Sequence, residues 1–146
     1  YTGWGVPVLP DQLPDHLPPY PGPLAGFLTG LTHCRTPWLL TVPCDSPFFP
    51  LDLAQRLAAC AHTHHARLVL AAAPDATGQL RPQPTFALLH RSLAPSLADF
   101  LQQGGHKIGQ WAQEQGRILC PFDRATDHPL RSFVNINTLA ELQTLE

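Results

Sequence analysis

The fold class is decided by residues 38–42 (WLLTV) and the turn that follows them, residues 43–47 (PCDSP). The first five residues form a continuous apolar run without alternation, which is typical of a strand buried on both faces of a parallel sheet. Two prolines end the strand abruptly and hold Asp45 in a rigid turn. Ligands of α/β sheets bind beyond the carboxyl ends of the strands, so this turn is the first place to look for chemistry.

The segments on either side alternate between short apolar runs and amphipathic stretches. Further strands are expected at residues 6–9, 67–73, 85–89, 118–122 and 133–136, and helices at residues 24–32, 52–62, 93–103, 108–115 and 139–145. This alternation predicts an α/β fold with a mostly parallel sheet. Residues 1–146 contain no repeat and no internal linker, so we expect a single domain.

The charge balance excludes several classes of function. Nine Lys and Arg residues stand against eleven Asp and Glu residues, so there is no basic excess to neutralise the phosphates of a nucleic acid. No run of about 18 apolar residues is present, which excludes a membrane-spanning helix. We therefore expect a soluble, cytoplasmic protein that binds neither nucleic acid nor membrane.

Cysteine and histidine do not predict a metal centre. The four cysteines form no Cys-x-x-Cys pair and lack the spacing of zinc ligands, and three of them sit in likely core segments, so we interpret them as buried, reduced thiols. His62, His64 and His65 fall at the end of a predicted helix, where histidine interacts favourably with the terminal carbonyl groups.

Asp45 is the first candidate functional residue. A carboxylate in the turn after a buried strand suits Mg²⁺, which takes one or two carboxylates and completes its shell with phosphate and water. The other interpretation is that Asp45 caps the following turn or helix, as aspartate often does. The pattern alone leaves both open.

Two further motifs point to a ligand. Asn135 and Asn137 are two residues apart on a predicted strand, so both amides would leave the same face and could orient a polar ligand; Asn137 could instead assist the turn into the last helix. Gly22 and Gly26 flank a predicted helix start that could bring free N–H groups close to an anion, although helix packing would explain both glycines equally well.

Together and in this order, these motifs resemble the molybdenum cofactor guanylyltransferase family. The resemblance is carried by YPGPLAG at residues 20–26, PCDSP at 43–47, QPT at 83–85 and FVNINT at 133–138, and it extends from about Val6 to the end of the chain. It implies a three-layer, Rossmann-like nucleotidyltransferase fold. The implied reaction is transfer of GMP from GTP to the terminal phosphate of molybdopterin, with release of pyrophosphate.

The resemblance also implies roles for individual residues. Asp45 matches the catalytic aspartate that holds Mg²⁺ and the GTP phosphates, and Gly22 belongs to the GTP-binding helix start. Asp11 matches a nucleotide-binding aspartate, with Asp15 as the alternative because the following loop carries extra residues.

On the molybdopterin side, the resemblance implies three binding residues, Lys107, Asn135 and Asn137. Lys107 is the sole lysine, and it could instead be simply solvated. Chaperones of molybdoenzymes are further implied partners.

One part of the family pattern is absent. The family begins with a strand and a glycine-rich loop carrying arginine and lysine that grip the GTP phosphates, and nothing of this kind occurs in residues 1–146. We therefore expect the chain to be N-terminally truncated, lacking its first βαβ part of about thirty residues. Alone, it should be unstable and nearly inactive; turnover of GTP and molybdopterin at the rate of a full-length relative would contradict this.

Other functions remain as alternatives. A molybdopterin cytidylyltransferase or a sugar-phosphate nucleotidyltransferase would use the same class of reaction, and the preference for GTP over CTP rests on the resemblance alone. A non-catalytic cofactor-binding module would keep the fold without the chemistry, although the presence of Asp45 argues against it.

Overall fold

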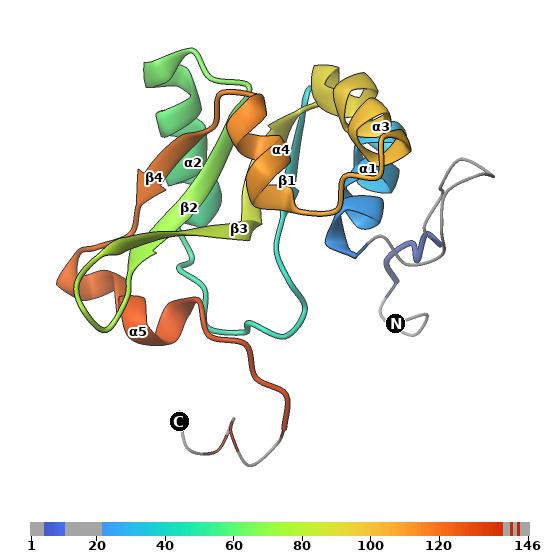
Figure 1. Ribbon diagram of the computed structural model, residues 1–146. Coiled ribbons are helices and arrows are strands. Elements are labelled where there is room, and N and C mark those ends of the chain that lie inside the picture. The colour runs from blue at the N-terminus through green and yellow to red at the C-terminus, as the bar shows by residue number, and fades with distance from the viewer. Residues whose placement is uncertain (1–4, 11–21, 139–140, 142, 144–146) are drawn as a thin grey trace.

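The computed structural model describes residues 5–10, 22–138, 141 and 143. Figure 1 shows the helices and strands along the chain, and α1 and α3 lie beside one another at one end of the sheet. The elements are α1 (Pro23–His33), β1 (Trp38–Thr41), α2 (Leu53–His64), β2 (Leu68–Pro74), β3 (Leu80–His90), α3 (Ala94–Gln102), α4 (Ile108–Glu114), β4 (Ile118–Pro121) and α5 (Pro129–Ser132), with short 3₁₀ turns at Arg91–Leu93 and Ala125–Asp127.

The four strands form one sheet in the order β1-β3-β2-β4. β3 is antiparallel to both of its neighbours, whereas β2 and β4 pair in parallel, so β1, β2 and β4 all run in the same direction. The α/β fold is confirmed, with β3 as its one reversed strand. A tight turn at Asp75, where Gly78 takes a φ of +80°, joins β2 to β3, and so short a connection can link only antiparallel strands.

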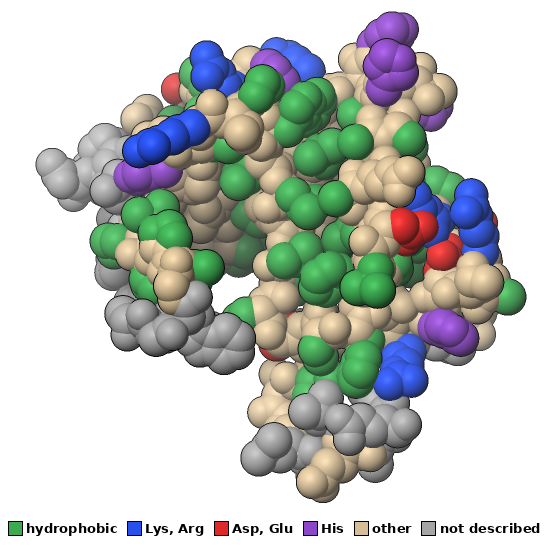
Figure 2. Space-filling model, turned by 180° about the vertical axis from the view of Figure 1, so that it is seen from behind, with side chains coloured by type: hydrophobic (Ala, Val, Ile, Leu, Met, Phe, Trp, Pro, Cys, Tyr) green, Lys and Arg blue, Asp and Glu red, His purple; other side chains and the backbone are tan. Residues whose placement is uncertain are grey.

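Helices cover both faces of the sheet, as expected for three layers. On one face α1, α3 and α4 pack against Leu68, Leu70 and Leu89; on the other, α2 packs against Val69, Ala71 and their neighbours. β2 is thus buried on both faces, which its apolar run predicted. Figure 2 shows the side of the molecule opposite to that seen in Figure 1, where apolar side chains gather over the middle.

Two predicted strands are wrong. Residues 6–9 form no strand, and residues 133–136 follow α5 as a loop. The alternation in FVNIN resembles a strand, but the backbone N–H groups are used elsewhere: Val134 bonds to the Arg131 carbonyl and Ile136 to the Asp45 carbonyl. Phe133 is nevertheless buried, with its ring edge-on to those of Phe86 and Phe122.

β1 lies at an edge of the described sheet and pairs antiparallel with β3, so the expectation that residues 38–42 form a strand buried on both faces of a parallel sheet is wrong for the described structure. Its only partner among the described strands is β3, and Leu40 and Val42 are each about two-fifths exposed. An edge strand offers unpaired N–H and C=O groups to a further strand. The expectation that an additional βαβ unit belongs here stays a prediction.

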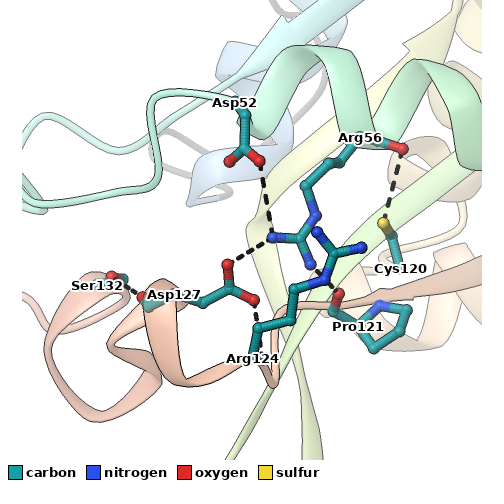
Figure 3. A network of polar contacts seen from close by, with 7 residues as sticks. All are labelled: Asp52, Arg56, Cys120, Pro121, Arg124, Asp127 and Ser132. Carbon is teal, nitrogen blue, oxygen red and sulfur yellow. Dashed lines mark hydrogen bonds and ion pairs between the residues drawn. The ribbon is translucent and has the colours of Figure 1, made fainter.

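A network of polar contacts joins α2 to the segment between β4 and α5 (Figure 3). Arg56 Nη1 donates to Asp127 Oδ1 at 2.6 Å, and its Nη2 donates to the Pro121 carbonyl at 2.6 Å. Arg56 also lies 3.9 Å from the centroid of the Phe122 ring, a cation–π contact. The side chain of Asp127 is only 6% exposed, so this is a nearly buried ion pair.

Besides the ion pair with Arg56, Asp127 accepts two further hydrogen bonds. Its Oδ2 accepts the Arg124 N–H at 3.0 Å, and its backbone carbonyl accepts the hydroxyl of Ser132, the last residue of α5. These contacts fold residues 124–132 into one compact unit. They therefore fix the point from which residues 133–138 leave α5.

The network shifts the pKa values of its members. Burial raises the pKa of Asp127, but the hydrogen bonds from Arg56 and Arg124, with the charges of both arginines, lower it below its usual value. Burial lowers the pKa of Arg56, but the hydrogen bond to Asp127 together with the charges of Asp127 and Asp52 outweighs this effect and raises the pKa above its usual value. Burial and a hydrogen bond with Cys60 raise the pKa of Cys120 to about 12, so Cys120 is a protonated core thiol.

Substitution Asp127→Asn should destabilise the protein by about 3 kcal/mol, because it leaves the Arg56 charge largely buried without its partner. Urea unfolding at pH 7 measures this. The matched control is Asp75→Asn, since Asp75 pairs with Arg81 at the surface and an amide can keep its turn contacts. A loss from Asp127→Asn no greater than that of the control would contradict this account of the network.

The pair also predicts a pH dependence. Because the pKa of Asp127 is lower in the folded than in the unfolded chain, the pair stabilises the fold above pH about 4 and loses this effect as the pH falls through the folded value. The wild type should therefore lose more stability than Asp127→Asn between pH 5 and pH 2 in unfolding titrations. Parallel curves for the two proteins would be evidence against it.

Candidate active site at the carboxyl end of β1

The sheet topology brings two of the candidate motifs to the same end. β1 and β4 run in the same direction, so the turn after β1 and the segment after β4 both lie beyond the carboxyl ends of their strands. Figure 1 shows α5 beside the connection from β1 to α2 at this end of the sheet. The switch-point rule for α/β folds places ligands in this region.

Two hydrogen bonds join the motifs directly. The Ile136 N–H donates to the Asp45 carbonyl at 2.7 Å, and Ser46 Oγ donates to Asn135 Oδ1 at 2.9 Å, across a separation of 89 residues. Ser46 is fully buried. We call this contact region, residues 45–48 and 131–136, the junction.

Asp45 is half-buried, and its carboxylate has no hydrogen bond or ion pair with any described residue. The capping interpretation required such a bond to a nearby backbone N–H, so the described contacts do not support it. The Asp45 carboxylate is therefore available to a ligand, while its backbone carbonyl anchors the junction.

The donor set fits Mg²⁺ better than a metal held by protein alone. Across residues 5–10, 22–138, 141 and 143, no group of three or more His, Cys, Asp or Glu side chains could hold a metal ion. Zinc sites need three or four protein ligands, whereas Mg²⁺ binds through one or two carboxylates together with substrate phosphates. One free carboxylate at a ligand-binding edge meets the second requirement.

The two asparagines do not share a strand face as predicted, because residues 133–136 are a loop. The Asn135 amide oxygen accepts the bond from Ser46 and so belongs to the junction. Asn137 is exposed, and its backbone N–H donates to Glu141 Oε2, while the Glu141 N–H donates to Thr138 Oγ1. The Thr138 hydroxyl thus accepts the Glu141 N–H, and Asn137 takes part in the same turn through its backbone.

Gly22 immediately precedes α1, with a φ of +71° that favours glycine, and a Cβ there would meet no atom within 4 Å. α1 connects to β1 through only four residues, Cys34 to Pro37, and runs opposite to it. Its N-terminus therefore points toward the junction end of the sheet. No side chain caps this helix start, as an anion-binding role would need.

Lys107 immediately precedes α4 and is exposed. α4 leads into β4 through a short connection and runs opposite to it, so its N-terminus also points toward this end. No described residue forms an ion pair with Lys107, and none joins it to the junction. Asp11 and its alternative Asp15 lie outside the described residues.

The sequence did not indicate two residues of the junction. Ser46 was only a neighbour of Asp45, and Arg131, at the C-terminal end of α5, was not a candidate. The Arg131 guanidinium lies 4.2 Å from the centroid of the Phe48 ring. No spacing rule relates residue 131 to residue 48, so only the fold could bring them together.

A large cavity lies at the opposite end of the sheet. It has a volume of about 670 Å³ between α2 and the sheet, with Trp38, Leu88 and His90 among its lining residues. Trp38 begins β1 and His90 ends β3, so the cavity opens at the amino end of β1, away from Asp45. None of the candidate residues lines it.

Comparison with known proteins gives a consistent result. Residues 1–118 match the model of the MobA-like NTP transferase domain. The whole chain is 52% identical, over 151 aligned residues, to the molybdenum cofactor guanylyltransferase of Acidovorax sp. strain JS42, and covers 69% of that protein. It is 45% identical to the protein of that name from Cupriavidus metallidurans, covering 68% of it.

A solved structure agrees with the fold. The crystal structure of molybdopterin-guanine dinucleotide biosynthesis protein A from Archaeoglobus fulgidus superposes with a TM-score of 0.65 at 25% sequence identity. The match covers 84% of this chain and 60% of that one, so the chain spans less than two thirds of its structural relative. The sequence, the family model and the fold thus agree, and the chain belongs to the MobA-like NTP transferase family of nucleotidyltransferases.

Proposed function

We propose that the protein transfers GMP from GTP to the terminal phosphate of molybdopterin, yielding the guanine dinucleotide form of the cofactor and pyrophosphate. The main support is the junction, where two hydrogen bonds join the segment that carries the unpaired Asp45 carboxylate to the segment that carries the Asn135 amide. Membership of a family with many relatives named molybdenum cofactor guanylyltransferase supports the choice of substrates.

Each residue has a defined task in this proposal. Asp45 would hold Mg²⁺ beside the GTP phosphates, and that ion would supply positive charge at the α-phosphate. Gly22 lets the start of α1 approach the nucleotide, and Asp11 contributes to nucleotide binding. The phosphate of molybdopterin is itself the nucleophile, so the protein forms no covalent intermediate; it positions the two substrates and stabilises charge.

On the acceptor side, Asn135 and Asn137 orient molybdopterin and Lys107 contacts the pterin or its phosphate. Asn135 is pre-oriented, because its amide oxygen is fixed by Ser46 and the amide nitrogen is left to donate to a ligand. Asn137 offers its side chain, since its backbone N–H is used by Glu141.

We place this reaction in the cytoplasm, with transfer of the product to molybdoenzymes through their chaperones. No helix among the described residues is long and apolar enough to cross a membrane. The substrates of the proposed reaction are a nucleotide and a phosphorylated pterin, and nucleic acid has no part in it.

Substitution Asp45→Asn should lower kcat/KM for GMP transfer by about 100-fold or more, because it removes the carboxylate that binds the metal. The assay measures pyrophosphate released from GTP and molybdopterin by the gene product, including any coding sequence before Tyr1. Asp99→Asn is the control, since Asp99 is exposed on α3 and its carboxylate has no partner in the described structure. Unchanged turnover in Asp45→Asn would contradict the catalytic role of Asp45, whereas no turnover by the wild type, with a biological output that Asp45→Asn leaves unchanged, would favour the non-catalytic binding module.

The choice of base is tested by competition. GTP should displace a labelled GTP analogue at lower concentration than CTP does, and GMP should be transferred to molybdopterin in preference to a sugar phosphate. Stronger displacement by CTP would replace the guanylyl assignment with a cytidylyl one. Transfer to the sugar phosphate alone would assign a different acceptor to the same fold.

A further inference from the structure

Arg131 occupies an unusual position at the junction. It belongs to α5, and its guanidinium stacks over Phe48 at 4.2 Å from the ring centroid. Phe48 lies three residues after Asp45, and Asn135 lies four residues after Arg131. The Ser46–Asn135 hydrogen bond therefore ties together the two segments that carry the cation and the carboxylate.

The hydrogen-bonding groups of Arg131 are not used by the described protein. Its Nε is buried without a partner, and no described carboxylate forms an ion pair with it. Arg56 contrasts with it, since both of its terminal nitrogens bond to protein acceptors in addition to its ring contact. A buried donor without an acceptor is costly, so a ligand that offers an acceptor to Nε would relieve that cost.

The charge of the junction indicates the ligand. Within residues 45–48 and 131–136, Asp45 is the one acidic residue and Arg131 the one basic residue. The planar guanidinium donates two parallel hydrogen bonds that match phosphate oxygens. Stacking on Phe48 fixes the plane of this fork before a ligand arrives, which lowers the entropy lost on binding.

We propose that Arg131 binds a phosphoryl group of the substrate at the junction, with Phe48 as its positioning residue. The proposal deepens the proposed function, on which it rests for the identity of that phosphate. Two sources share the chemistry: the polyphosphate of the nucleotide and the terminal phosphate monoester of the acceptor. The experiment below separates them by using one probe for each.

The test measures binding of pyrophosphate and of glycerol 3-phosphate to the purified gene product, including any coding sequence before Tyr1, by isothermal titration calorimetry with Mg²⁺ present. Arg131→Gln should weaken binding of one probe by about tenfold or more, and Arg131→Lys should retain part of the affinity because it keeps the charge but loses the fork. Arg91→Gln is the matched control, since Arg91 is exposed at the opposite end of the sheet, and it should bind like the wild type. Loss confined to pyrophosphate assigns Arg131 to the nucleotide; loss confined to glycerol 3-phosphate assigns it to the acceptor.

A second measurement needs no variant. An arginine-specific dicarbonyl reagent is applied to the wild type with and without each probe, and modification is quantified by peptide mass spectrometry. A bound phosphate should protect Arg131 several-fold and leave Arg91 unprotected. If neither probe binds, or if Arg131→Gln binds as tightly as the wild type and Arg131 is not protected, the proposal is wrong.

Failure of the proposed function would look different. Because binding and protection are measured without turnover, they can succeed even if GMP is not transferred. Conversely, transfer of GMP that is unaffected by Arg131→Gln would leave the proposed function standing and overturn the role of Arg131.

Discussion

The hydrogen bond from the Ile136 N–H to the Asp45 carbonyl, supported by the Ser46–Asn135 bond, is the constraint on which the site depends. It uses the backbone of Asp45 to anchor the loop, so the carboxylate keeps its freedom to bind a ligand. Ser46 is fully buried, and an unsatisfied hydroxyl there would be costly, so Asn135 is held in place by the same contact. The hydrogen bonds that stabilise the junction therefore also determine where the candidate groups lie.

This contact needs the segment after β4 to start from a fixed position. The ion pair between Arg56 and Asp127 supplies that position, since it links α2 to the turn before α5 in a largely buried setting. The Phe122 ring lies against the Arg56 guanidinium and in turn contacts the ring of Phe133. None of these residues is expected to touch a substrate, yet they determine where Asn135 and Arg131 lie.

Local patterns predicted the elements well where one physical signal dominated. The apolar run of β2 and the helical spacing of α2 were sufficient to predict both elements. A strand buried on both faces gives a continuous apolar run, and a helix buried along one stripe gives apolar residues at helical spacing. The strand expected at residues 133–136 failed because alternation records which side chains are buried, and Phe133 is buried from a loop. The reversed direction of β3 follows from the short turn at Asp75. The repeated alternation of strands and helices favoured a mostly parallel sheet, so the sequence analysis did not use this turn to predict an antiparallel pair.

The candidate site was predictable in part. Asp45 was chosen because it follows a strand, where α/β proteins bind ligands, and Asn135 because it was expected on a strand that the structure does not form. The structure brings the two segments together at the junction, and the roles of both residues stay predictions. Their separation of 89 residues, and the pairing of Arg131 with Phe48, depend on the tertiary fold. No periodicity in the sequence encodes such contacts.

The central claim is that the metal and nucleotide bind at the junction. The most direct measurement is the broadening of backbone amide NMR resonances by paramagnetic Mn²⁺, substituted for Mg²⁺, in the presence of GTP. The account predicts that resonances of residues 44–48 and 131–136 broaden first and that those lining the α2 cavity, such as His62 and Leu88, stay sharp. Broadening centred on the cavity, with the junction unaffected, would contradict it.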